Sequence, residues 1–206
     1  MADPNLTKLL KWSIENQENH DGPKTQRQLD PALLQSLFGG PTEADLMKAN
    51  MECITSVDPE VTLESKLTAF DNFEQLIESI DNANNIATLS LWTPLLGCLE
   101  HEESEMRRMA AWCVGTAVQN NAKSQERLLA VGGIPTLVKM ALDEGENKAV
   151  RKKAVYALSS ACRNYQPAMD LCVEELGKNG RQHDKLDAED MDAVDAVLHP
   201  LREAAN

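Results

Sequence analysis

Two stretches of the sequence, RRMAAWCVGTAVQN at residues 107–120 and RKKAVYALSSACRN at residues 151–164, repeat one pattern at a distance of 44 residues. Identical or similar residues match at Arg107/Arg151, Ala110/Ala154, Trp112/Tyr156, Ala117/Ala161 and Asn120/Asn164. A period of about 40 to 47 residues is typical of armadillo and HEAT units, which are built from helices. The two stretches therefore predict a helical-repeat protein.

Weaker copies extend the pattern towards the N-terminus. AFDNFEQLIESIDNANNI (69–86) places Ala69-Phe70 over Ala111-Trp112 at a shift of 42 residues, and WTPLLGCL (92–99) resembles GIPTLVKM (133–140). Pro94 and Pro135 then fall near helix starts, where proline is tolerated. Apolar residues step by three and four, as in Leu63, Leu67, Phe70, Phe73, Ile77 and Ile80. Such stripes are buried only when units stack, which predicts an all-α, armadillo-type solenoid whose last helix in each unit lines a concave side.

The composition supports this fold and favours a protein partner. Of the 206 residues, 42% are hydrophobic but only 4% are aromatic, a mixture that favours helices over sheets. The net charge of −13 argues against nucleic acid or a membrane as the main partner. Only residues 106–165 are basic, with 10 basic and 4 acidic side chains. A basic segment between acidic ones suits a protein surface of mixed charge, and we expect a monomer.

The repeats are expected over residues 42–178, between two different ends. Residues 1–41 predict a flexible region with short amphipathic helices, because Leu6, Leu10 and Ile14 are followed by the polar stretch ENQENHDGPKTQRQ. Thr42 and Asp45 resemble a capping box that opens a helix. Residues 179–206 predict an acidic C-terminal helix or tail, with apolar residues at Met191, Val194, Leu198 and Leu201.

The cysteines and the N-terminus indicate a cytoplasmic protein. Five cysteines form an odd set without a CxxC pair, and most stand among apolar residues, where cysteine acts as a small hydrophobe. The start, MADPNLTKLL, has no long apolar run after a basic residue. No stretch approaches the roughly 18 apolar residues that a membrane span requires. We therefore expect a reducing compartment.

Short amides follow the last apolar residues of three successive units. These residues are Asn82-Ala83-Asn84-Asn85, Asn120-Asn121 and Arg163-Asn164. If each group ends a helix, stacking of the units would align the groups in a row along one rim, offering donors and acceptors to a partner. Each asparagine is explained equally well as a cap for unpaired backbone groups, so both interpretations stay open.

No catalytic residue, cofactor site or metal site is predicted. Gly132-Gly133 precedes a helix without a preceding strand, unlike a phosphate-binding loop. Cys98, His101 and Glu105 could meet on a helical turn, but three loose ligands make a poor zinc site. No serine or cysteine has a nearby base, so we expect no enzyme. Trp112 and Tyr156 are interpreted as core wedges between helices.

Three motifs in this order carry a resemblance to a known family. LLKWSIEN (9–16), DPALLQSLFGGP (30–41) and AFDNFEQLIESIDNANNI (69–86), leading into armadillo-type units, resemble the fungal nucleotide-exchange factors of cytosolic heat shock protein 70 chaperones. These are relatives of the animal heat-shock-protein-binding protein, and the resemblance covers roughly residues 6–165. It implies a co-chaperone that embraces one lobe of the chaperone's ATPase domain and opens the nucleotide cleft, so that ADP leaves. It further implies client release, a role in protein folding and an involvement in translation.

The resemblance also assigns residues to these roles. The contact surface would include Asn82, Ala83, Asn84 and Asn85 and, by repeat equivalence, Asn120, Asn121, Arg163 and Asn164. Ala83 is expected in a tight interface, where arginine would block docking and leave the fold intact. The candidates for client release are Leu9, Leu10, Trp12 and Ile14, although their helix docking on the protein's own surface is an equal alternative. Members of the family carry about four repeats, whereas here the pattern fades after Asn164.

A general armadillo adaptor that holds an extended peptide is the alternative function. Such proteins often place Trp and Asn four residues apart on the concave helix. Here those places hold Trp112 with Thr116 and Tyr156 with Ser160. The missing amides count against peptide binding.

Overall fold

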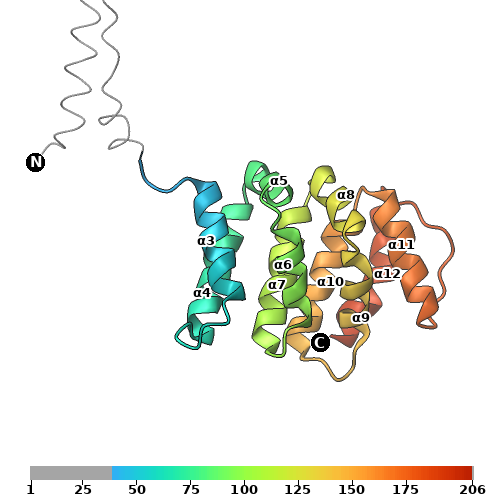
Figure 1. Ribbon diagram of the computed structural model, residues 1–206. Helices are drawn as coiled ribbons and strands as arrows, with labels where there is room; N and C mark the ends of the chain where they lie inside the picture. Colours follow the sequence, from blue (N-terminus) through green and yellow to red (C-terminus); the bar gives the residue numbers. More distant parts are fainter. Residues whose placement is uncertain (1–38, 206) are drawn as a thin grey trace, which may run out of the picture. The chain divides into compact units, whose positions relative to one another are not determined.

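The computed structural model describes residues 39–205, and no strand occurs among them (Figure 1). The chain divides into residues 1–42 and residues 43–206, and every described helix belongs to the latter. In chain order these are α3 (Glu43–Thr55), α4 (Leu63–Ile77), α5 (Ile80–Thr88), α6 (Trp92–Gly97), the 3₁₀ turn η1 (Cys98–Glu100), α7 (Ser104–Val118), α8 (Ala122–Ala130), α9 (Gly133–Leu142), α10 (Lys148–Cys162), α11 (Gln166–Lys178) and α12 (Met191–Ala204). The all-α prediction is confirmed.

Two complete three-helix units follow one another in the middle of this part of the chain. The first consists of α5, α6 with η1, and α7, and the second consists of α8, α9 and α10. Helices α7 and α10 both have 15 residues and begin 44 residues apart, at Ser104 and Lys148. The pairs α3–α4 and α11–α12 flank them. The predicted armadillo-type solenoid is therefore confirmed.

The register of the first copy differs by one residue from the prediction. Helix α4 begins at Leu63 and α7 at Ser104, a shift of 41 rather than 42 residues. Phe70 thus matches Ala111, and both are fully buried. The sequence comparison placed Phe70 over Trp112 because both are aromatic, although Trp112 is only half-buried. Local similarity of side chains was here a poorer guide than the spacing of buried positions.

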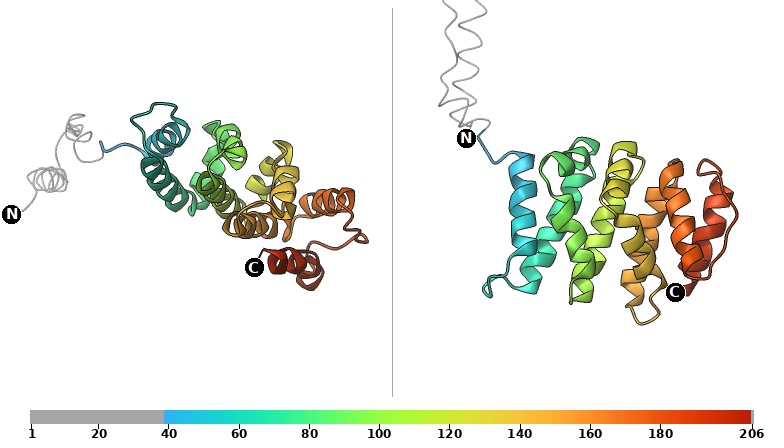
Figure 2. Two further views of the ribbon diagram at one scale, coloured as in Figure 1. Left: turned by 90° about the horizontal axis from the view of Figure 1, so that it is seen from below. Right: turned by 45° about the vertical axis from the view of Figure 1, so that its right-hand side comes forward.

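The helices of residues 43–205 form two layers (Figure 2, left). Helices α4, α7, α10 and α12 lie side by side in one layer, the inner row, on the inner side of the curve of these residues. Helices α3, α6, α9 and α11 form the other layer, while α5 and α8 stand at one edge (Figure 1). This confirms that the last helix of each unit lines the concave side.

The core lies between the two layers and follows the predicted stripes with two exceptions. Phe70, Phe73 and Ile77 of α4 are at most 1% exposed. Leu63 and Ile80, which were expected in the same stripe, are 39% and 58% exposed. They are the first residues of two different helices, α4 and α5, with a break at Glu78-Ser79. Because the run is not one helix, its periodicity does not carry Ile80 into the core.

The ends of α7 and α10 explain two of the asparagines. Asn120 and Asn164 adopt left-handed backbone conformations, with φ of 52° and 58°. Asparagine enters this region more readily than other residues that carry a side chain. In addition, the backbone N–H of Asn164 donates to the carbonyl of Ala188, at 2.9 Å. The capping interpretation is therefore supported at both positions.

The C-terminal helix α12 packs against α10 of the last complete unit. Its buried residues are Val194, Val197, Leu198 and Leu201, which lie on one face. The segment between α11 and α12 is held by Gln166, whose amide donates to the carbonyl of Leu186 and accepts from the N–H of Ala188. Residues from 179 onward thus lie in the same compact unit as the repeats.

An ion pair ties the two complete units together at the edge opposite α5 and α8. The Arg107 guanidinium donates to both oxygens of Glu146, in the turn before α10, and also to the carbonyls of His101 and Glu102. The side chains are only 20% and 8% exposed. The hydrogen bond from Arg107 lowers the pKa of Glu146 more strongly than burial raises it.

We predict that Glu146→Gln lowers the free energy of unfolding by about 2 kcal/mol at neutral pH, because a charge-assisted hydrogen bond to a largely buried arginine is lost. The folded pKa of Glu146 lies below its ordinary value of 4.5, so its charge stabilises the fold above that pH. This contribution disappears as the pH falls through the folded pKa. Urea unfolding of both proteins from pH 7 to pH 3 checks this; a difference that does not shrink in acid would contradict it.

Candidate functional site

The solvent side of the inner row, called the inner face, carries a stripe of polar and aromatic side chains on each helix. Polar and aromatic residues that make contacts or line hollows on this face include Asp71 and Glu74 of α4; Arg108, Trp112 and Thr116 of α7, with Gln119 just after it; Lys152, Lys153, Tyr156 and Ser159 of α10, with Arg163 just after it; and Asp195 and Arg202 of α12. Their spacing of three and four residues keeps each stripe on one side of its helix.

An aromatic and cationic group occupies the middle of the inner face. The Nζ of Lys153 is 3.9 Å from the centroid of the Trp112 ring and 5.4 Å from that of Tyr156. The Tyr156 hydroxyl donates to Oε1 of Gln119, which links α10 to α7. Burial lowers the pKa of Lys153, and nearby Arg108 lowers it further. Trp112 and Tyr156 are half-buried, so they are not fully core residues as predicted; Trp112 packs against the core, the Tyr156 ring packs against Gly115 of α7, and both side chains line the inner face.

The inner face changes sign along its length. At its α4 end, Asp71 and the largely buried Glu74 are acidic, and Oε1 of Glu74 accepts a hydrogen bond from the Thr116 hydroxyl at 2.7 Å. The rest of the face, from α7 to α12, is mostly basic. It carries Arg108, Lys152, Lys153, Arg163 and Arg202, and Asp195 is the one acidic residue named there. The basic segment expected between residues 106 and 165 thus contributes most of the positive end.

At the positive end, two arginines hold α12 against α10. Arg163, the residue after α10, and Arg202 of α12 both donate to Oδ1 of Asp195. Both also donate to the Ser159 hydroxyl, at 3.1 and 3.0 Å. The two arginines lower the pKa of Asp195, although its partial burial opposes them. One carboxylate is thus shared by two guanidinium groups.

The residues of the predicted amide row lie at one edge of residues 43–205, the edge where α5 and α8 stand. Residues 82–85, however, do not end a helix. They lie inside the separate helix α5, so that part of the prediction is wrong. Asn82 and Ala83 are 4% and 2% exposed, whereas Asn84 and Asn85 are half-buried. The Asn82 amide donates to Glu43 and to the carbonyl of Leu76, so it holds α5 in place. Oδ1 of Asn84 is buried and has no hydrogen-bond partner among residues 39–205.

The other members of the row differ in the same way. Asn121 is buried and caps α8 by accepting from the N–H of Ser124. Asn120 and Asn164 are exposed, and Arg163 is half-buried. Direct contact with a partner is therefore open to Asn84, Asn85, Asn120, Arg163 and Asn164. Asn82, Ala83 and Asn121 are buried and stabilise the edge through their packing and hydrogen bonds.

Two residues that the sequence did not single out connect this edge. The Ser124 hydroxyl donates to the carbonyl of Ala83, at 3.4 Å. The buried amide of Gln125 donates to the carbonyls of Ser160, Ala161 and Arg163, which are left unpaired at the end of α10. The sequence did contain a signal for Gln125, because this polar residue occupies a position that faces the core. A buried amide requires hydrogen-bond partners.

The remaining predicted residues do not form a reactive site in the described part of the chain. Leu9, Leu10, Trp12 and Ile14 lie outside it. Burial raises the pKa of Cys98 to about 11 and that of Cys113 well above its ordinary value, so these thiols pack as protonated, apolar groups. Within residues 39–205, no three His, Cys, Asp or Glu side chains are arranged to hold a metal ion. No helix there is long and apolar enough to cross a membrane.

Comparison with known proteins gives two adjoining family matches. Residues 6–86 match the nucleotide exchange factor Fes1, and residues 82–178 match the SIL1/FES1/HPBP1 C-terminal domain. An engineered protein of known crystal structure aligns with 84% of this chain and 66% of its own, with a TM-score of 0.57. At 20% identity, that likeness supports the fold alone.

Full-length relatives agree with these matches. The Hsp70 nucleotide exchange factor FES1 of Gibberella zeae is 65% identical, and the alignment covers 98% of each chain. The Hsp70 nucleotide exchange factor fes-1 of Neurospora crassa is 52% identical with the same coverage. FES1 of Eremothecium gossypii is 46% identical over 84% of this chain and 60% of its own. The chain therefore belongs to the Fes1 family of nucleotide exchange factors.

Proposed function

We propose that this chain is a nucleotide exchange factor of cytosolic Hsp70, which binds the ATPase domain of the chaperone as a monomer and accelerates the release of ADP. The observation that carries the proposal is 65% identity over nearly the whole length to a protein named for this activity. Faster ADP release promotes the release of client proteins and thereby their folding. A connection to translation remains a prediction from the resemblance.

The inner face and the accessible residues of the amide edge are the proposed contact surface. Trp112, Tyr156 and Arg163 are of the types that contribute most to binding energy in protein interfaces. Four helices line the concave surface, which supports the docking of a folded lobe. A bound peptide is less well supported, because the hydroxyl of Thr116 is already bonded to Glu74 where peptide-binding repeats present a free amide.

The proposed mechanism is differential binding. A factor releases ADP only if it binds the open form of the ATPase domain more tightly than the form closed around ADP. By linkage, ADP must weaken the binding of the factor by the same ratio as the factor weakens the binding of ADP. The rigid contacts between units help here, because a surface that adapted to both forms would shift neither.

We predict that the protein speeds the release of a fluorescent ADP analogue from purified cytosolic Hsp70. The affinity for the isolated ATPase domain should be roughly 5- to 150-fold lower when ADP is saturating. Stopped-flow fluorescence measures the release, and titration calorimetry measures both affinities. Equal affinity for the nucleotide-free and the ADP-bound domain would exclude the mechanism.

The amide edge is tested by two arginine substitutions with different expected results. Asn85→Arg changes a half-buried residue whose side chain makes no hydrogen bond in the described structure, so it should preserve the fold and weaken binding to the ATPase domain. Ala83→Arg places a charge at a position that is 2% exposed, and should lower the free energy of unfolding by about 3 kcal/mol or more. Ala83→Arg therefore cannot separate docking from folding, contrary to expectation. Urea unfolding and calorimetry check both variants; unchanged binding of a folded Asn85→Arg would remove the edge from the interface.

The proposed role of the N-terminal segment in client release is tested by deletion. Removing residues 1–38 should leave ADP release intact and slow the release of a labelled client peptide from Hsp70. A substitution of Trp12 and Leu9 by serine in the full chain serves as the milder version. Client release at the parent rate with both changes would show that Leu9, Leu10, Trp12 and Ile14 have another role.

A further inference from the structure

A small hollow lies between α10 and α12 at the positive end of the inner face. It measures about 300 Å³ and is lined by Lys152, Val155, Tyr156, Ser159 and Arg202. Four of these residues belong to α10, but Arg202 comes from α12, which is beyond the last residue, 178, that the family models match. The hollow therefore exists only because α12 packs beside α10.

The charges around the hollow are unbalanced. Arg163 and Arg202 share the single carboxylate of Asp195, and Ser159 accepts a hydrogen bond from each of them. The exposed side chain of Lys152 has no hydrogen bond or ion pair with any residue described in the structure. Two positive charges are thus left without a counter-charge at the rim of a hollow whose walls are a valine and a tyrosine ring.

This arrangement selects one kind of ligand group. An arginine that is fixed by other hydrogen bonds, beside an exposed lysine that makes no hydrogen bond of its own, suits a carboxylate, which accepts from both. Nucleic acid would also carry acceptors, but a polyanion would meet Asp71 and Glu74 at the other end of the inner face and a chain with a net charge of −13. A single acidic side chain on a folded protein avoids that repulsion.

We propose that the hollow receives an aspartate or glutamate side chain of the Hsp70 ATPase domain, so that α12 acts as a fourth contact helix of the inner face. The proposal rests on the proposed function and adds to it a specific residue pair, Lys152 and Arg202. It gives the C-terminal helix a direct part in binding, in place of a role limited to covering α10.

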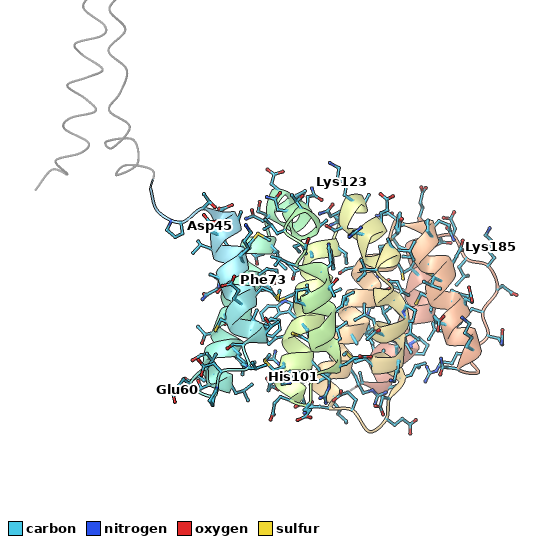
Figure 3. All side chains as sticks on the ribbon, viewed as in Figure 1. Asp45, Glu60, Phe73, His101, Lys123 and Lys185 are labelled. Carbon is cyan, nitrogen blue, oxygen red and sulfur yellow. The ribbon has the colours of Figure 1, made fainter. Side chains whose placement is uncertain are left out.

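The decisive variant is Lys152→Glu, because the Lys152 side chain contributes no bond to the fold. Its affinity for the isolated ATPase domain should fall about tenfold, equivalent to about 1.4 kcal/mol. Lys152→Gln should lose less affinity and make binding less sensitive to salt. Lys185→Glu is the matched control, because Lys185 is exposed in the segment between α11 and α12 (Figure 3) and does not line the hollow; this variant should bind within twofold of the parent.

Arg202→Gln tests the contribution of α12, with thermal unfolding measured in parallel because this variant also loses the bonds to Asp195 and Ser159. Weaker binding by both Arg202→Gln and Lys152→Glu supports the proposal. A loss confined to Arg202→Gln, together with a lower melting temperature, would mean that α12 acts through packing alone and would overturn it.

Chemical cross-linking identifies the partner group directly. A carbodiimide activates a carboxylate, and Nζ of Lys152 then displaces the urea to form an amide bond. Mass spectrometry of the complex should show Lys152 joined to an aspartate or glutamate of the ATPase domain. If the parent protein binds the domain, but Lys152→Glu binds equally well and no such cross-link forms, this inference fails while the proposed function stands. If the parent does not bind the ATPase domain at all, the proposed function itself fails.

Discussion

The close packing of α7 on α10 is the contact on which the rest of residues 43–205 depends. Gly115 has no side chain, and an added Cβ would stand 2.4 Å from the ring of Tyr156. Small residues are also buried along both helices, at Ala110, Ala111 and Ala117 and at Ala154, Ala157 and Ala161. Larger side chains at such positions would force the helices apart at a cost of about 1 to 3 kcal/mol. This tight seam, together with the bonds from Arg107 to Glu146 and from Ser124 to Ala83 at opposite edges, fixes the angle between the two units.

The sequence predicted the fold because its information is periodic, and it misplaced residues where the period breaks. The copies at 107–120 and 151–164 located two helices of equal length and their shared alanines. The asparagines of 82–85 were assigned to the end of the preceding helix because apolar spacing runs from Leu63 to Ile80 without a proline or glycine. The break at Glu78-Ser79 carries no strong signal, since Ser79 makes no side-chain cap. The extended backbone of Ser79 shows that a new helix starts there, and this helix then packs against α8.

The candidate surface was less predictable, because it depends on which side chains meet across helices. A stripe of apolar and aromatic residues is typical of a helix face in the core, and Trp112 was therefore predicted to be a core residue. Its environment depends on Lys153, a residue 41 positions away in the sequence whose ammonium lies over the Trp112 ring. Asn82 shows the reverse case, since a polar residue expected at a surface is buried where it donates to a backbone carbonyl. Residue type alone does not separate these cases, whereas the contacts do.

The order of charges along the inner face has a consequence for the proposed complex. A partner could in principle enter the curve in either direction, since the repeats present similar backbones. The acidic α4 end and the basic α10–α12 end remove that symmetry, because a reversed partner would place like charges together. In the proposed complex, aromatic contacts at Trp112 and Tyr156 would supply affinity but would be largely insensitive to direction, so the charges would set the orientation. For a nucleotide exchange factor, the orientation of the partner decides whether ADP is released. The same contacts made in the reversed orientation would not separate the two sides of the nucleotide cleft.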